Sequence, residues 1–273
     1  MLPIHTSGHH ADSPDSLHRA VMDRVVSSYT PTITTLRHTR QHSDRGQPPA
    51  GDERALIVAM PVMPGVGYLP QARAEATLVA AHLPGAIQLI RRPGDTTVSA
   101  ATGPRAADGT AQAAPTKASV LAHLAGCATA HFACHGASDP TDPSRSRLLL
   151  QDHRHNPLTV ASLTALNLEH ARLAYLSACS TALNQQFQLL DEAIHLAAAF
   201  QMAGFPHVVA TLWTISDECA PALADAFYTN LADGAAALDT GRAAYALHHA
   251  VQDLRRRLPL SPSLWAAYLH AGA

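Results

Sequence analysis

The chain has 273 residues and a formal net charge of −2; 47% of its residues are hydrophobic and 15% are charged. That length suits one large domain or two small ones, and the apolar fraction predicts a folded core. Without an excess of basic residues, the composition argues against nucleic acid as a partner. The N-terminus lacks the basic start and apolar stretch of a signal peptide, and the sequence predicts no membrane-spanning segment.

The four cysteines argue against a disulfide framework. Their number is low for the chain length, and none of them forms a C-x-x-C pair. Such spacing favours free thiols in a reducing compartment. We therefore expect a cytoplasmic protein.

Short apolar runs alternate with segments of helical spacing along the first half of the chain. The elements expected there are, in order, a short strand at 25–29, a helix at 32–40, a buried strand at 55–60, a helix at 70–82 and a strand at 87–91. Residues 92–114, rich in Gly, Pro and Ala, show no periodicity and are expected to form a mobile loop.

The second half repeats the strand-then-helix order. The expected elements are a helix capped by Thr116, a strand at 128–134, a hairpin of 148–151 with 158–160, a short helix near 161–166, a strand at 171–176, a helix at 191–202 closed by Gly204, a strand at 207–212, and helices at 217–231 and 238–256. This order predicts a parallel α/β sheet in a single domain spanning residues 1–273. In such sheets the ligand crevice lies beyond the carboxyl ends of the strands.

Two short stretches carry the residues of a thiol-based site. His-Phe-Ala-Cys-His-Gly at 131–136 and Leu-Ser-Ala-Cys-Ser-Thr at 176–181 each lie where an expected strand ends. They place His135 and Cys179 at the edge where parallel sheets bind ligands. A thiol is a strong nucleophile only as the thiolate, and a neighbouring imidazole commonly activates it near neutral pH. The pair is therefore typical of a cysteine nucleophile and its base.

Each of these residues, taken alone, also has a structural interpretation. Cys134 alternates out of phase with His135 along the strand, which predicts that Cys134 is a core residue. Cys179 lies among small side chains, which leave its thiol accessible and the nearby backbone N–H groups free to bind an oxyanion. Gly136 allows close approach of a substrate, although a His-Gly turn can be merely structural.

The ordered motifs of the chain resemble those of the CHAT domain, a caspase-like cysteine peptidase family. The resemblance covers about residues 25–272 and includes the two stretches above, Asp191-Glu192 ahead of Ala198 to Gly204, Val208 to Trp213 with Asp217, and the closing Pro262 to Tyr268. It implies a caspase-like three-layer α/β/α sandwich around a mostly parallel sheet, and the hydrolysis of peptide bonds.

The resemblance also assigns roles to individual residues. It implies that Cys179 is the nucleophile, that His135 is the catalytic histidine, and that the backbone N–H groups of Gly136 and Cys179 form the oxyanion hole. It demands no third carboxylate. The partners it implies are a protein or peptide substrate and a regulatory protein, as in bacterial-type signalling.

A substrate pocket is expected along residues 213–217. In the family this segment borders the pocket for the residue before the scissile bond, so Trp213 and Asp217 are its candidate residues, and Asp217 could pair with a basic substrate side chain. The favoured alternative is that Asp217 caps the helix that follows it, while Trp213 belongs to the core. Asp191 and Glu192 lie at an expected helix start, where negative charge suits the helix dipole.

The histidines do not predict a metal site. His131 and His135 share a strand face, and Cys127, His153 and His155 are near in sequence, but they lack the paired ligand spacing of structural zinc sites. We therefore expect neither a metal nor a cofactor.

The N-terminal part is a departure from the family pattern. The opening, Leu2 to His5, resembles the middle of the family's N-terminal part, and the helical repeats that often precede the domain do not appear in this sequence. We therefore expect an abbreviated N-terminal part, and an unpaired sheet edge there would invite association.

Two other functions compete with an endopeptidase. One is a catalytically idle interaction or scaffold domain, in which replacing Cys179 would leave the biological effect intact. The other is a redox or acyl-transfer protein that uses Cys179, which predicts reversible oxidation without cleavage. It ranks last because Cys179 has no resolving cysteine near it in sequence.

Overall fold

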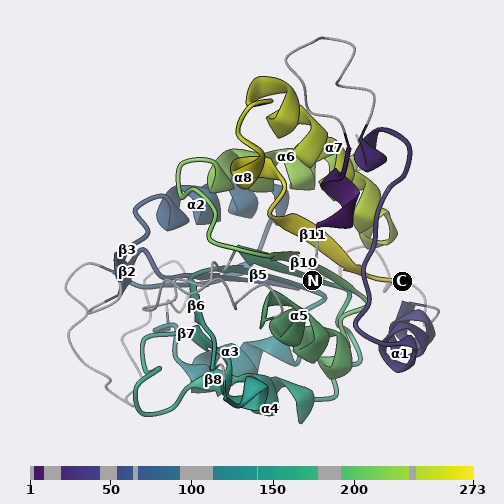
Figure 1. Cartoon of the computed structure of the whole chain (residues 1–273). Coiled ribbons are helices and arrows are strands. Elements are labelled where there is room, and N and C mark those ends of the chain that lie inside the picture. The colour runs from purple at the N-terminus through teal and green to yellow at the C-terminus, as the bar shows by residue number, and fades with distance from the viewer. Residues whose placement is uncertain are drawn as a thin grey trace.

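A six-stranded sheet in the order β11-β10-β9-β5-β1-β4 separates two helical layers (Figure 1). The computed structural model describes residues 3–8, 20–43, 54–63, 67–92, 113–139, 141–177, 192–233 and 238–273. The strands are β1 (Ala55–Ala59), β4 (Ile87–Ile90), β5 (Thr129–Ala133), β9 (Leu173–Ser177), β10 (His207–Thr211) and β11 (Tyr268–Gly272). All neighbouring pairs are parallel except β10 and β11, which are antiparallel.

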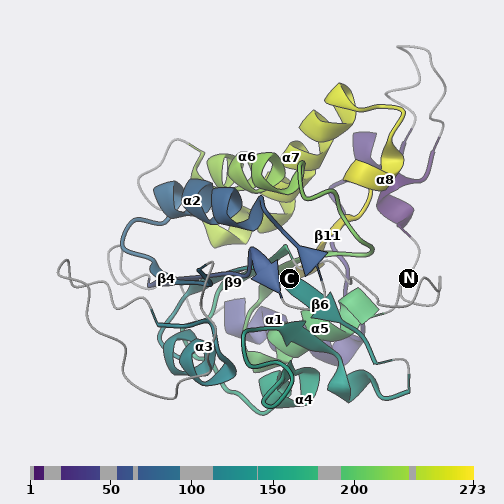
Figure 2. The same cartoon turned by 90° about the vertical axis from the view of Figure 1, so that its left-hand side faces the viewer.

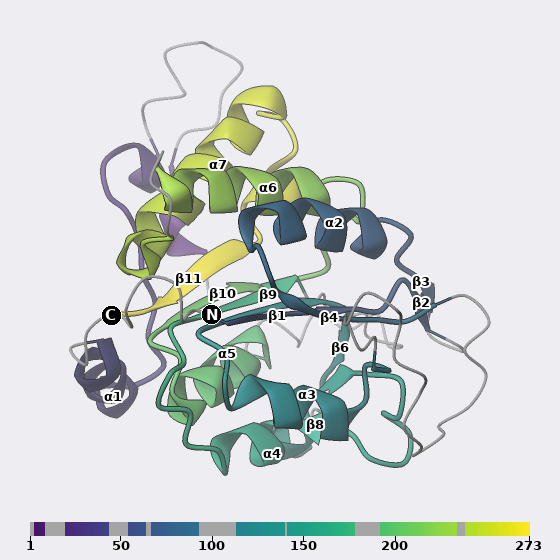
Figure 3. The same cartoon turned by 180° about the vertical axis from the view of Figure 1, so that it is seen from behind.

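Helices cover both faces of this sheet, as the view from behind shows (Figure 3). One layer contains α2 (Ala72–His82), α6 (Ala220–Ala232), α7 (Ala243–Arg257) and α8 (Pro262–Trp265). The other contains α1 (Ile33–Ser43), α3 (Lys117–Leu124), α4 (Val160–Thr164) and α5 (Glu192–Ala203). The expected three-layer α/β/α architecture is therefore confirmed.

Alternation along the strands divides the buried side chains between two cores. On β5, Ala130 and Phe132 belong to the core on the α3 and α5 side, while Ala133 belongs to the core on the α2 and α6 side. Cys134 is completely buried in the first of these cores, which confirms its expected structural role. The central strands are buried on both faces, which explains their continuous apolar sequences.

Two small sheets lie at one end of the large sheet, where Figure 1 labels their strands and Figure 2 turns that end toward the viewer. One pairs β2 (Val62–Met63) with β3 (Gly67–Tyr68), and the other has the order β6-β7-β8, from His135–Ala137, Arg147–Leu149 and Leu158–Thr159. The pairing of β7 with β8 is the expected hairpin. The sequence predicts a strand that ends at residue 134. In the structure the chain bends at Cys134 and continues as β6, because His135 and the next two residues pair with β7.

Most predicted elements are present with shifted ends, and two are changed. Residues 25–29 do not form a strand; only Tyr29 forms an isolated bridge, to Ala271, because the backbone of the segment bonds β11 at Tyr29 alone. The helix expected at 217–231 begins at Ala220, after a turn. Of the expected loop 92–114, residues 93–112 lie outside the described residues.

Thr116 caps α3 as the sequence predicts, since its side chain accepts a hydrogen bond from the Ser119 N–H. Gly204 ends α5 with φ +128°, a backbone conformation that favours glycine. No helix in the described ranges combines the length and the hydropathy needed to cross a membrane.

Candidate active site

Strand register brings the two candidate motifs to the same edge of the sheet. Ala133 at the end of β5 is paired with Ser177 at the end of the parallel strand β9. His135 and Cys179 each come two residues after one of these paired residues. Cys179 itself lies outside the described residues, so the register places its strand and not its thiol.

His135 is the first residue of β6 and is only 2% exposed. Burial lowers the pKa of its imidazole below the ordinary 6.5, while a hydrogen bond with the Gly67 backbone and the negative charge of Asp217 oppose this shift. A histidine whose pKa is lowered in this way is neutral near pH 7, as a base must be to accept a proton there. The environment of His135 is therefore compatible with a catalytic base.

The glycine at the start of β3 allows the backbone to approach this histidine. Gly67 has φ +147°, a conformation that side-chain-bearing residues rarely adopt. A Cβ atom built at this position would lie 3.9 Å from Nε2 of His135, so the glycine faces the imidazole. The small β2-β3 sheet thus forms one wall around His135.

Asp217 lies in the turn between β10 and α6 and caps a different helix from the expected one. Its Oδ2 atom accepts a hydrogen bond from the Gln71 N–H at 3.0 Å, and Gln71 is the N-cap residue of α2. The N-cap of α6 is Cys219. The expectation that Asp217 caps the helix following it is therefore wrong. The carboxylate instead joins segments 146 residues apart in the sequence and lies close enough to His135 to raise its pKa.

A pocket opens between the first turn of α2, the ends of β5 and β9, and the turn that carries Asp217. Its described lining residues are Leu69, Ala72, Glu75, Ala133, Ser177, Ile215, Asp217 and Ala220. The structure thus brings Asp217 to the edge where β5 and β9 end. Trp213 is not among these lining residues, and its ring N–H donates to the Ser263 backbone carbonyl at 2.8 Å.

Glu75 is a pocket residue that the sequence did not single out. It is 2% exposed and shares the buried side of α2 with Ala72, Ala76 and Val79. These positions follow the i, i+3, i+4, i+7 spacing of an apolar helix face. A carboxylate in the middle of such a face is unusual, and this anomaly is the sequence signal that could have identified Glu75.

The other predicted site residues are placed only in part. Gly136 is buried in β6 and pairs with Leu148, which places its backbone directly after His135. Asp191 lies outside the described residues, and Glu192 is the first residue of α5. In the part of the chain that the structure describes, no group of three or more His, Cys, Asp and Glu side chains could hold a metal ion.

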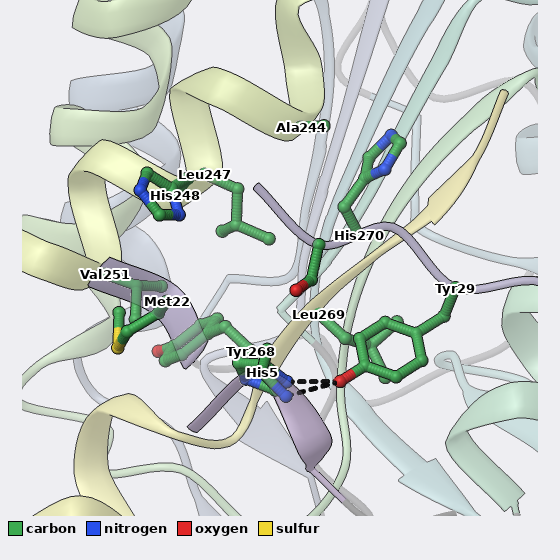
Figure 4. Close-up of a pocket in the computed structure, with 11 residues that line it drawn as sticks. His5, Met22, Tyr29, Ala244, Leu247, His248, Val251, Tyr268, Leu269 and His270 are labelled. Carbon is green, nitrogen blue, oxygen red and sulfur yellow. Dashed lines mark hydrogen bonds between the residues drawn. The ribbon is translucent and has the colours of Figure 1, made fainter. Parts of the chain in front are cut away.

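A second cavity lies beside the edge strand β11, between the N-terminal segment, α7 and β11. Figure 4 shows His5 beside Tyr29, with His248 on α7 and His270 on β11. Nδ1 of His5 is 2.6 Å from the Tyr29 hydroxyl. Burial lowers the pKa of His5 to about 4 and that of His270 to about 3. These imidazoles are therefore neutral in the folded protein near pH 7.

Comparison with known proteins identifies the family. The CHAT domain family model matches residues 1–273. The chain belongs to the CHAT domain family. Among curated protein sequences, none matches this CHAT domain significantly.

Solved structures with the same fold include two larger proteins. The CHAT domain is similar to separase in the Saccharomyces cerevisiae separase–securin complex, with a TM-score of 0.56 and 13% identity over 92% of this chain. It is also similar to the Arg-specific cysteine proteinase gingipain R, with a TM-score of 0.55 and 10% identity over 89% of this chain. The chain spans 14% of that separase chain and 52% of that gingipain chain. At these identities the likeness establishes a cysteine peptidase-like fold.

Proposed function

We propose that this CHAT domain is a cysteine endopeptidase in which Cys179 is the nucleophile and His135 is the general acid and base. The observation that carries the proposal is the register between β5 and β9, which pairs Ala133 with Ser177. Because the chain leaves both strands in the same direction, the two motifs begin side by side at the carboxyl edge of the sheet. The buried, neutral imidazole of His135 supports the same assignment.

The proposed reaction proceeds through an acyl-enzyme. The Cys179 thiolate forms a bond to the scissile carbonyl carbon, and the oxyanion that develops accepts hydrogen bonds from the backbone N–H groups of Gly136 and Cys179. His135, which takes the proton of the Cys179 thiol when the thiolate forms, donates it to the leaving amine as the C–N bond breaks. It then takes a proton from a water molecule, whose oxygen attacks the thioester to release the carboxylic acid and restore the thiol.

The pocket beside this edge suits the substrate side chain that precedes the scissile bond. Asp217 supplies a partly exposed carboxylate there. A carboxylate favours a basic substrate residue, which agrees with the description of the structural neighbour gingipain R as Arg-specific. We therefore propose basic residues before the cleaved bond.

The proposal includes a protein partner and a reducing compartment. The separase neighbour was solved in complex with securin, which supports regulation of this domain by another protein. The described cysteines Cys127 and Cys219 are free thiols, which supports cytoplasmic residence.

The test combines a thiol-directed probe with a peptide library. We expect the probe to label Cys179, and we expect cleavage that is lost in Cys179→Ala and kept in Cys219→Ser, which removes a partly exposed thiol outside the proposed dyad. Absence of both labelling and Cys179-dependent cleavage would overturn the peptidase assignment. Retention of the cellular effect by Cys179→Ala would instead support an interaction domain.

A further inference from the structure

Beneath the pocket lies a buried hydrogen-bonded chain of three side chains from three elements. Oε1 of Glu75 on α2 is 3.0 Å from Nε2 of His131 on β5, and Nδ1 of His131 is 3.2 Å from the Tyr228 hydroxyl on α6. Glu75 is 2% exposed and the other two side chains are completely buried. Burying a carboxylate is costly, so a fold that retains one there must hold it with specific partners.

The hydrogen bonds fix the direction of each donor. A carboxylate only accepts, so Nε2 of His131 carries the proton that bonds Glu75. In the neutral imidazole Nδ1 is then the acceptor, and Tyr228 donates its O–H to it. The His131 ring also stacks on Tyr175, with centroids 4.8 Å apart and an interplanar angle of 16°. The carboxylate of Glu75 is therefore held in one orientation.

One oxygen of each pocket carboxylate remains available. Among the described residues, Oε2 of Glu75 and Oδ1 of Asp217 have no hydrogen-bond partner, while Oε1 and Oδ2 are engaged by His131 and Gln71. The described residues lining the pocket include both acids and neither lysine nor arginine. Two carboxylates with unused acceptors and no basic neighbour in the lining attract a cation.

We propose that Glu75 is a specificity-determining residue that binds, together with Asp217, the guanidinium group of a substrate arginine. His131 and Tyr228 are positioning residues that hold the Glu75 carboxylate toward the pocket. The inference rests on the proposed peptidase function and adds a second acid to its pocket. A guanidinium has five N–H donors in a planar fork and can bond two carboxylates at once, whereas the ammonium of lysine is a point charge. Arginine is therefore favoured over lysine.

The test measures binding without turnover. Ethylguanidinium and its neutral isostere ethylurea are titrated by NMR into the full chain carrying Cys179→Ala. We expect ethylguanidinium to bind at least about tenfold more tightly than ethylurea, because charged hydrogen bonds are the stronger ones. Glu75→Gln preserves the acceptor for His131 and should remove most of this preference, as should Asp217→Asn. Tyr228→Phe should weaken it less, about two- to fivefold.

Matched variants separate charge from folding. Asp225→Asn replaces an acid on α6 that bonds His82 outside the pocket, and it should leave ethylguanidinium binding unchanged. Glu75→Asp retains the charge but withdraws it from the pocket by one methylene, so its affinity for ethylguanidinium should be intermediate. This variant keeps the proposal testable if Glu75→Gln does not fold. Equal binding of the two ligands, or unchanged guanidinium affinity in both Glu75 variants, would overturn the proposal.

The outcome is distinguishable from failure of the peptidase assignment. If ethylguanidinium binds as expected and the active chain neither cleaves peptides nor labels at Cys179, the cation site stands and the peptidase does not. If Cys179-dependent cleavage shows no preference for arginine over citrulline, and Glu75→Gln leaves that selectivity unchanged, the cation site is wrong while the peptidase assignment stands.

Discussion

Ala133 and Ser177 are paired residues at the ends of two adjacent parallel strands, β5 and β9. His135 and Cys179 follow them by two positions each. Because both strands end at the same edge of the sheet, the segments that carry the proposed base and the proposed nucleophile start from neighbouring strand ends. If the two residues form the proposed dyad, replacement of either one should abolish the same reaction.

Replacing His135 by asparagine is expected to lower kcat/KM for peptide cleavage by about 10²–10⁴-fold, the usual contribution of a general acid or base. The folding of the variant is checked by its thermal transition. A matched control is His153→Asn, since His153 lies on the β7-β8 hairpin and bonds the Leu150 carbonyl instead. Wild-type rates in His135→Asn would remove this histidine from the mechanism.

The pKa of His135 should respond to Asp217 in a defined direction. Burial lowers this pKa below 6.5, and the negative charge of Asp217 partly opposes that shift. In Asp217→Asn the imidazole loses this stabilisation of its charged form, so its pKa should fall further. NMR titration of the His135 ring in the Cys179→Ala background measures the midpoint free of coupling to the thiol.

The control for this titration is Asp225→Asn. Asp225 is 2.8 Å from His82, a histidine remote from His135 in sequence. The substitution should leave the His135 midpoint in place. A His135 midpoint that is equal in wild type and Asp217→Asn would show that the Asp217 charge does not reach the imidazole.

Much of this fold could be predicted because its strands carry local signals. The runs that became β1 and β9 are apolar throughout, as burial on both faces requires. Thr116 predicted the start of α3 because threonine is a favoured N-cap residue. Such features depend on a few neighbouring residues and can be recognised without knowing the rest of the molecule.

The parts that the sequence missed depend on partners distant in the chain. Asp217 follows the rule for a helix cap, yet the helix it caps is α2, whose N-cap residue Gln71 lies 146 residues earlier. Glu75 is anomalous within its own helix, but its partner His131 comes from β5. Strand β6 forms only through its pairing with β7. Tertiary pairing, which local spacing does not encode, decided each of these.

Gly204 should tolerate substitution poorly because two effects combine there. It has φ +128°, and a Cβ atom at this position would lie 2.4 Å from the Leu168 backbone oxygen. Gly85 is the matched control, with φ +79° and nothing within 4 Å of such a Cβ. We expect Gly85→Ala to lower the free energy of unfolding by about 1–2 kcal/mol, the cost of the left-handed backbone alone.

Gly204→Ala should cost about 2 kcal/mol more than Gly85→Ala, since the backbone carbonyl must also move. Urea denaturation of both variants measures the difference. Equal losses in the two variants would mean that the chain around Leu168 relaxes freely.

Acid should destabilise the fold through the buried histidines of the second cavity. His5 has a pKa of about 4 in the folded protein, set mainly by burial, and faces Tyr29, His248 and the Ala266 backbone. Because the folded pKa is below the unfolded value of about 6.5, protonation favours the unfolded chain. The free energy of unfolding is therefore unaffected by His5 above pH 6.5 and falls as the pH drops from 6.5 toward 4.

At pH 5 the loss due to His5 should be about 2 kcal/mol. Urea denaturation at pH 7 and pH 5 measures this loss, and His5→Gln, which cannot be protonated, should reduce the difference by about that amount. His249→Gln is the control, because this side chain is exposed on α7. An identical loss between pH 7 and pH 5 in wild type and His5→Gln would show that His5 does not bind its proton on unfolding, and that the acid sensitivity arises elsewhere, for instance at His207 and His270.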